Sequence, residues 1–97
     1  MAGAGPVMAA FRAVVSGRVQ GVGFRYSTIR RARALHLYGA VSNQADGSVA
    51  VTAEGPRSSL EELLAWLSHG PPGAHVRDVT VDWVPWSGRY RDFEVEF

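Results

Sequence analysis

The stretch from Gly17 to Arg25 reads Gly-Arg-Val-Gln-Gly-Val-Gly-Phe-Arg and joins an alternating apolar segment to a segment with helical periodicity. Its glycines Gly17, Gly21 and Gly23 permit positive φ angles, so successive backbone N–H groups can converge on one anion. The helix that follows would direct its first N–H groups and the positive end of its dipole to the same point. Arg25 falls in the first turn of that helix, and its planar guanidinium suits bidentate binding of a phosphoryl group. We therefore predict an oxyanion cradle.

A glycine-rich connector between a strand and a helix can also be a simple turn, so the loop alone leaves that interpretation open. Two common phosphate motifs are absent from the chain. It has ten arginines and no lysine, so it cannot place a Walker lysine on a nucleotide phosphate. It also lacks the Gly-x-Gly-x-x-Gly fingerprint, and 97 residues leave little room for two mononucleotide-binding halves.

Two longer patterns resemble the signatures of the acylphosphatases, in the same order. The first is Gly17-x-Val19-Gln20-Gly21-Val22-x-Phe24-Arg25, and the second is Gly39-x-Val41-x-Asn43-x-x-Asp46-Gly47-x-Val49. The resemblance extends from about Phe11 to Phe97. It departs from the usual family pattern at Ala40, Ser42 and Ala50, which are not catalytic positions and bear on substrate preference or edge packing.

Periodicity predicts an α+β fold. Phe11, Ala13 and Val15 alternate with more polar residues, and Asp46-Gly47 supplies a hairpin turn. We expect Gly39 to end the first helix, and Ser58 with Glu61 to form a capping box for the second. The expected strands are 10–16, 40–43, 48–53, 76–84 and 93–97, and the expected helices are 24–37 and 58–69.

This order is βαββαβ plus a short C-terminal strand. It predicts a ferredoxin-like two-layer sandwich, in which two helices cover one face of a mostly antiparallel sheet. The resemblance to acylphosphatases implies the same plan. We expect one domain over residues 10–97 and a flexible N-terminal tail over residues 1–9.

The composition of the chain limits where the protein can act and what it can bind. The net charge is only +1, which argues against a nucleic-acid binder. The chain has no cysteine, which excludes disulfides. The N-terminus lacks the basic start and apolar run of a signal peptide, and no stretch is apolar enough for a membrane span. We therefore expect a cytoplasmic monomer that binds neither membrane nor nucleic acid.

Few side chains in the sequence indicate a catalytic or metal-binding role by themselves. His36, His69 and His75 show no metal-ligand spacing, so we predict no metal and no cofactor. Asn43 ends a short apolar run, where it could be an ordinary turn residue or an amide that orients a water molecule. Asp46 is explained by its place in the turn.

The resemblance assigns roles to two of these positions. Arg25 matches the phosphate-binding arginine of acylphosphatases, and Asn43 matches the residue that orients the attacking water. The implied activity is hydrolysis of the carboxyl-phosphate bond of small acyl phosphates, with inorganic phosphate or sulfate as competing anions. The implied phosphate-binding set is Gln20, Gly21, Val22, Gly23, Phe24 and Arg25.

Two other functions remain open at this point. The first is a non-catalytic phosphate or carbamoyl-phosphate binding module, since similar domains are built into larger enzymes. The second is an RNA-binding sheet of the same topology, which would need stacking aromatic residues on its central strands. Val14, Ser16, Ala50 and Thr52 supply none there.

Overall fold

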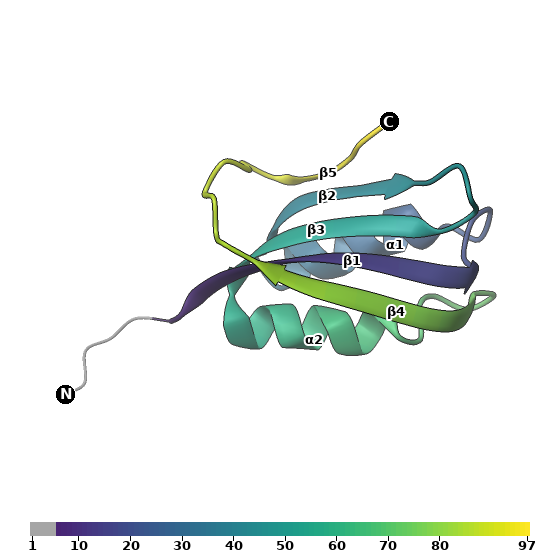
Figure 1. Ribbon diagram of the computed structural model, residues 1–97, viewed down its shortest axis with the longest axis horizontal. Helices are drawn as coiled ribbons and strands as arrows, with labels where there is room; N and C mark the ends of the chain where they lie inside the picture. The colour runs from purple at the N-terminus through teal and green to yellow at the C-terminus, as the bar shows by residue number, and fades with distance from the viewer. Residues whose placement is uncertain (1–5) are drawn as a thin grey trace.

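The computed structural model describes residues 6–97, and it confirms the predicted βαββαβ order with an additional short strand (Figure 1). None of the helices described there is long and apolar enough to cross a membrane. The strands are β1 (Met8–Arg18), β2 (Tyr38–Asn43), β3 (Val49–Pro56), β4 (His75–Val84) and β5 (Phe93–Val95), and the helices are α1 (Phe24–Ala34) and α2 (Arg57–Leu67).

The five strands form one sheet in the order β4-β1-β3-β2-β5, with both helices on one face (Figure 1). Three of its pairings are antiparallel, and only the β2–β5 pair is parallel. The alternation predicted for β1 is confirmed, because Phe11, Ala13 and Val15 are fully buried beneath the helices. From the helices, Phe24 and Leu60 complete this core. The predicted ferredoxin-like sandwich is therefore correct.

β1 begins at Met8, two residues before the expected start of the domain at residue 10. Met8 and Ala9 continue the ladder opposite Pro56 and Gly55 of β3. Val7 is also bonded to the start of α2, because its carbonyl oxygen accepts a 2.8 Å hydrogen bond from the Arg57 N–H. Residues 8 and 9 therefore belong to β1 and not to the tail predicted over residues 1–9. Residues 1–5 lie outside the described part of the chain.

The predicted end of α1 was wrong. The helix ends at Ala34, and His36, three residues before Gly39, adopts a left-handed conformation with φ 58°. Gly39 instead lies within β2, where a Cβ atom would stand 1.9 Å from the Thr52 carbonyl oxygen. Close contact between strands, and not helix termination, requires glycine at this position.

The predicted capping box of α2 was also wrong. α2 begins at Arg57 directly after Pro56, and no side chain caps its N-terminus. Pro56 has φ −60°, so it ends β3 and leads straight into the helix, which places Ser58 inside the first turn. Glu61 instead forms an ion pair with Arg57, at 3.6 Å.

A buried carboxylate holds the connection between β4 and β5. Glu54 of β3 is 4% exposed, and its carboxylate accepts hydrogen bonds from the Ser87 N–H at 2.8 Å, the Ser87 hydroxyl at 2.7 Å and the Gly88 N–H at 3.0 Å. These bonds satisfy a charge that would otherwise be costly to bury. They also fix the path by which the chain crosses from one edge of the sheet to the other.

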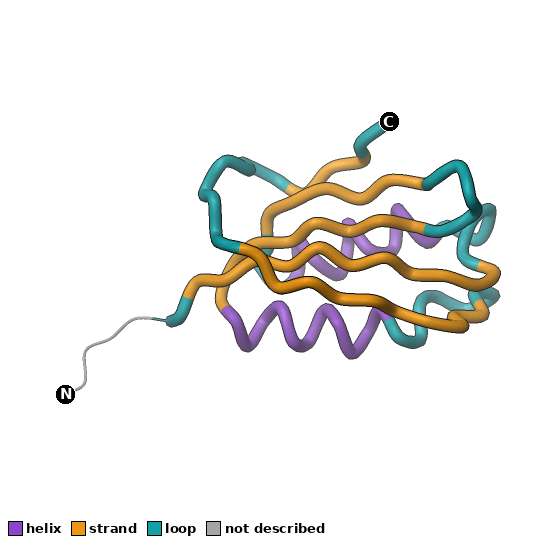
Figure 2. The backbone as a smooth tube through the Cα atoms, in the orientation of Figure 1, coloured by secondary structure: helices purple, strands orange, loops and turns teal. Residues whose placement is uncertain are grey.

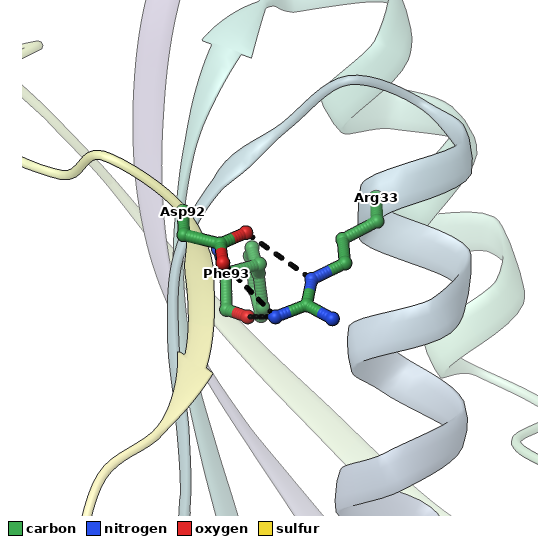
Figure 3. Close-up of polar contacts among 3 residues, drawn as sticks. All are labelled: Arg33, Asp92 and Phe93. Carbon is green, nitrogen blue, oxygen red and sulfur yellow. Dashed lines mark hydrogen bonds and ion pairs between the residues drawn. The ribbon is translucent and has the colours of Figure 1, made fainter.

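The start of β5 is held against α1 by a bidentate ion pair (Figure 3). The Arg33 guanidinium donates to both Asp92 carboxylate oxygens, at 3.1 and 3.0 Å, and to the Phe93 carbonyl oxygen at 3.0 Å. β5 has only three residues paired with β2, and this contact adds to the anchoring by the Phe93 side chain, which is fully buried in the core. The Phe93 N–H donates to Asp92 at 2.7 Å, and this bond, together with the charge of Arg33, lowers the pKa of Asp92.

We predict that Asp92→Asn destabilises the protein near neutral pH and that the difference disappears in acid. Because the folded-state pKa is lowered, the stabilisation by Asp92 is present above about pH 4 and is lost as the pH falls through the folded-state pKa. Urea unfolding of both proteins at a series of pH values measures the difference. If the difference stayed constant into strong acid, Asp92 would not stabilise the fold through its charge.

Candidate active site

A pocket of about 270 Å³ opens at the end of the sheet where β1 leads into α1. Figure 2 shows the turn after β1 and the turn between β2 and β3 at this same end of the molecule. Four parts of the chain line the pocket, namely the glycine-rich turn, the first turns of α1, the end of β2 and the C-terminal segment. The lining residues are Val19, Gly21, Gly23, Phe24, Arg25, Tyr26, Ile29, Asn43, Val95 and Phe97.

The glycine-rich turn has the backbone conformation that the sequence predicted. Gly21 and Gly23 have φ 75° and 76°, and a Cβ atom on either would meet no neighbouring atom. Glycine is therefore favoured here by the positive φ angle and not by crowding. Gly23 is also the N-cap of α1, so the turn passes directly into the helix.

The N–H groups of this turn are free to bind a ligand. Within residues 6–97, those of Gly21, Val22 and Gly23 donate to no protein group, and the first helical bond is from Ser27 to the Gly23 carbonyl, at 3.0 Å. The N–H groups of Phe24 and Arg25 precede that bond, as the first N–H groups of any helix do. A run of unpaired donors at the positive end of a helix favours a bound anion.

Gly17 does not belong to this turn, contrary to the prediction. It lies in β1 at a bulge opposite β4, with φ 126°. A Cβ atom there would stand 2.2 Å from the His75 carbonyl oxygen. Glycine at position 17 therefore allows two strands to approach each other, and it does not line the pocket.

Two predicted phosphate-binding residues direct their side chains into the core. Phe24 is 2% exposed and packs on Trp66 with ring centroids 5.7 Å apart, and Val22 also packs against the core. Phe24 lines the pocket, whereas Val22 is not among its lining residues. Their burial anchors the turn, and the Thr28 hydroxyl donates to the Phe24 carbonyl oxygen at 2.8 Å.

The Gln20 side chain connects the glycine-rich turn to the β2–β3 hairpin. Its Nε2 donates to the Gln44 carbonyl oxygen at 2.8 Å and to the Ser48 carbonyl oxygen at 2.9 Å. This amide cannot also face the pocket, so any ligand contact from Gln20 must come from its backbone. Sequence analysis missed this role because the partners are 24 and 28 residues away.

Arg25 places a charged side chain at the pocket. It is the second residue of α1, it is half-buried, and it lines the pocket. Its guanidinium forms no ion pair within residues 6–97, and α1 has no acidic residue in its first turn. Of the described side chains that line the pocket, Arg25 alone is charged. The pocket is therefore electropositive.

Asn43 is the last residue of β2, and its exposed side chain lines the same pocket. The turn that follows is as predicted, because the Asp46 carboxylate accepts bonds from the Ser48 hydroxyl at 2.6 Å and the Ser48 N–H at 2.9 Å. These bonds, led by the hydroxyl, lower the pKa of Asp46. Asp46 therefore shapes the turn and does not line the pocket.

The histidines lie apart from the pocket and from each other. His36, His69 and His75 are all exposed, at the end of α1, after α2 and at the start of β4. Within residues 6–97 no group of three or more His, Cys, Asp or Glu side chains could hold a metal ion.

The structure adds pocket residues that sequence analysis did not identify. Tyr26 and Ile29 belong to α1, while Val95 and Phe97 come from the C-terminal segment. Helical spacing after Arg25 could have suggested the first two. The last two are brought to the site only by the pairing of β5 with β2.

The fold and the site define a class of protein, a ferredoxin-like α+β domain with an electropositive, glycine-lined pocket at the end of a central strand. The sequence pattern of the acylphosphatase family matches residues 11–95. The acylphosphatase of Burkholderia thailandensis is 49% identical over 80 residues, which cover 82% of each chain. The acylphosphatase of Acaryochloris marina is 46% identical over 90 residues, covering 93% of this chain and 96% of the relative.

Solved structures agree with these relatives. An acylphosphatase from Coxiella burnetii superposes with a TM-score of 0.88 and 39% identity, covering 92% of this chain and 93% of that one. Full-length HypF, in a phosphate- and nucleotide-bound form, superposes with a TM-score of 0.87 and 27% identity over 99% of this chain but only 13% of its own. The chain belongs to the acylphosphatase family and has the activity of that family, with an acyl phosphate as substrate.

We predict that Gln20→Ala loosens the β2–β3 turn beside Asn43. Loss of the two hydrogen bonds between the glycine-rich turn and the β2–β3 turn should lower the free energy of unfolding by about 1–2 kcal/mol. Amide hydrogen exchange at residues 44–48 should become faster. Urea unfolding and exchange measured by NMR test this expectation.

The matched control is Gln44→Ala. Gln44 uses its side-chain amide only within the hairpin, donating to the Ser42 hydroxyl at 2.8 Å. This variant should leave the connection between the two turns intact. Equal acceleration of exchange in both variants would mean that Gln20 does not hold the hairpin in place.

Proposed function

We propose that this chain hydrolyses small acyl phosphates by holding the phosphoryl group between Arg25 and the N–H groups of residues 20–24. The observation that supports this most strongly is the shared pocket, since unpaired backbone donors, an unpaired guanidinium and the Asn43 amide all border it. Each donor suits an oxygen of a tetrahedral oxyanion. Their positions are set by folding, so little reorganisation accompanies binding.

In this proposal Asn43 holds the attacking water. Its side-chain amide can donate and accept at once, and it approaches the pocket from β2 while the phosphate donors lie in the turn before α1. The water oxygen bonds to phosphorus as the bond between phosphorus and the carboxyl oxygen breaks. The electron pair of that bond leaves with the carboxylate.

A strong general base is not needed for this reaction. A carboxylate is a good leaving group, so it departs without protonation. The phosphoryl oxygens can accept the proton from the water and yield inorganic phosphate. Arg25 and the backbone donors then stabilise the charge that develops on the phosphoryl oxygens, which makes positioning and electrostatics the source of catalysis.

We also propose that the chain acts as a cytoplasmic monomer that binds no nucleic acid. The described residues of a single chain already bring the glycine-rich turn, Arg25 and Asn43 to one pocket. The open face of the sheet carries Val14, Ala50 and Thr52 on its central strands, which offer no aromatic ring for base stacking. Light scattering tests the oligomeric state, and filter binding tests RNA.

We predict different effects for Arg25 and Asn43 substitutions. Arg25→Ala should weaken phosphate binding and abolish turnover, and Arg25→Lys should also fail because a point charge cannot replace the planar fork. Asn43→Ala should leave phosphate affinity nearly unchanged while kcat falls by about 10²-fold or more, the scale of losing one preorganised donor. Phosphate titration and substrate-loss assays measure the two effects separately.

Arg31→Ala is the control, because Arg31 is an exposed arginine of the same helix that lies outside the pocket. It should change neither measurement. The role of Asn43 in holding water is wrong if Asn43→Ala weakens phosphate binding as much as Arg25→Ala, or if it retains full turnover.

We predict that phosphate and sulfate compete with substrate and that a chelator leaves activity intact. Both anions present the tetrahedral oxyanion that the cradle would bind, so they should also raise the melting temperature as their concentration increases. Inhibition kinetics and thermal melts measure this. Inhibition that high substrate cannot overcome, or activity that needs a divalent ion after chelation, would contradict the mechanism.

A further inference from the structure

A groove lies between the two helices that cover the sheet. Two cavities, of about 360 and 340 Å³, adjoin each other there, because Arg31 of α1 and Trp66 of α2 line both. We call the combined space the interhelix groove. Among the described residues, it shares no lining residue with the pocket at the glycine-rich turn. The proposed phosphoryl chemistry therefore leaves this groove unused.

The groove is open because small residues border it on both helices. Ala34 of α1 and Ala65 of α2 are exposed and line it, and each lies within one helical turn of Arg31 or Trp66. A methyl side chain at these positions leaves a space that a longer side chain would fill. The stripes of α1 and α2 that bury residues such as Ala32 and Leu63 pack on the sheet and not in the groove.

The floor of the groove is apolar and firmly supported. Trp66 and Leu35 are half-buried and pack against the core. The Trp66 ring lies on Phe24, with ring centroids 5.7 Å apart. Gly70 closes one end, where a Cβ atom would stand 2.5 Å from the Phe24 ring. A large apolar side chain placed on Trp66 would therefore bury apolar surface on a floor that is already in position.

The rim of the groove is basic along α1. Arg30 and Arg31 are exposed, and within residues 6–97 neither guanidinium forms an ion pair. Among the described lining residues, Glu62 is the single acidic one. Arginine and tryptophan are the residue types that dominate binding energy at protein interfaces. The groove combines both types, with the charges at the rim and the ring on the floor.

We propose that the interhelix groove binds an acidic segment of a partner protein, in which carboxylates flank one large apolar side chain. The apolar side chain lies on Trp66 and Leu35, and the carboxylates accept hydrogen bonds from Arg30 and Arg31. The charge of the rim selects an acidic segment over a basic one. A segment of several residues suits the groove because the space continues across two adjoining cavities.

The test is an NMR titration with a short synthetic peptide in which glutamates flank a central phenylalanine. The Trp66 indole N–H reports binding at the floor, and its signal is assigned by its loss in Trp66→Phe. The chain has three tryptophans, so Trp83 of β4 and Trp86 in the following loop are internal controls. The Trp66 signal and the amide signals of residues 27–35 and 62–70 should shift, while the other two indole signals stay in place.

Two further peptides test the chemistry of the partner. One carries lysines in place of the glutamates, and the other carries serine in place of the phenylalanine. Each should bind at least about tenfold more weakly, because one reverses the charge and the other removes the burial of a ring. Binding of the acidic peptide should also weaken as the salt concentration rises.

Variants of the groove test its location. Ala34→Glu and Ala65→Glu place a longer, negatively charged side chain in the space and should weaken peptide binding by at least about tenfold. Both positions are exposed on helices, where glutamate is well tolerated. Arg31→Ala should weaken binding by about two- to fivefold, the scale of an exposed ion pair. Arg77→Ala is the matched control, since Arg77 is exposed on β4 outside the groove, and it should change nothing.

The proposal is overturned if the acidic peptide leaves the Trp66 signal unmoved, or if the lysine peptide binds as tightly. It is also overturned if both glutamate variants, shown by their amide spectra to be folded, bind the peptide as well as the unmodified protein. Displacement of the peptide by inorganic phosphate at constant ionic strength would place it at the glycine-rich turn instead. Single-stranded RNA that shifts the same signals as strongly would mean that the arginines recognise negative charge in general.

Peptide binding and hydrolysis can fail separately. Turnover of acetyl phosphate by a protein that does not bind the peptide would remove the docking site and leave the reaction intact. Peptide binding at Trp66 without turnover would retain the docking site and contradict the reaction.

Discussion

The positive φ angles of Gly21 and Gly23 are the constraint on which the rest of the site depends. They turn the chain from the central strand β1 into α1 within a few residues, and they leave successive N–H groups without protein partners. The same turn places Arg25 in the first turn of the helix, beside those donors. A residue with a side chain would meet no neighbour at either glycine, so the constraint is purely one of backbone conformation.

The sandwich then assembles the site around this turn. β1 lies between β4 and β3, and β3 pairs with β2, so Asn43 at the end of β2 arrives at the same end of the sheet. The Gln20 amide spans the remaining distance by binding two carbonyl oxygens of the β2–β3 turn. Two segments that carry different parts of the proposed chemistry are thereby held in one geometry. Such rigidity suits a reaction driven by positioning.

The edge strand β5 positions the C-terminal part of the pocket lining. β5 is short and pairs with a single neighbour. A surface ion pair and the buried Glu54 carboxylate of β3, which accepts hydrogen bonds from the connecting loop, help to fix its path. Its residues complete the pocket without any role in the proposed phosphoryl chemistry. Val95 and Phe97 therefore reach the pocket from a part of the chain that is separate from the glycine-rich turn and from α1.

Much of this protein could be predicted from local sequence. Alternating apolar residues predicted the strands, helical spacing predicted α1 and α2, and the glycines of the turn predicted its backbone conformation. The helix ends were predicted less well. α1 ends before His36, which has a left-handed backbone conformation, and α2 begins directly after Pro56 without a side-chain cap. The roles of Gly17 and Gly39 were also missed, since each faces a backbone atom of a neighbouring strand.

The sequence by itself determined the class of fold and the conformation of the glycine-rich turn, because both depend on residues close together in the chain. Its two motifs also supplied the candidates Arg25 and Asn43, through their resemblance to the acylphosphatase signatures. Only the tertiary structure decided that Gln20 bonds to the hairpin, that Phe24 and Val22 pack against the core, and that Val95 and Phe97 border the pocket. The physical reason is that these contacts join segments tens of residues apart. Their geometry follows from strand register and side-chain packing, which local patterns do not specify.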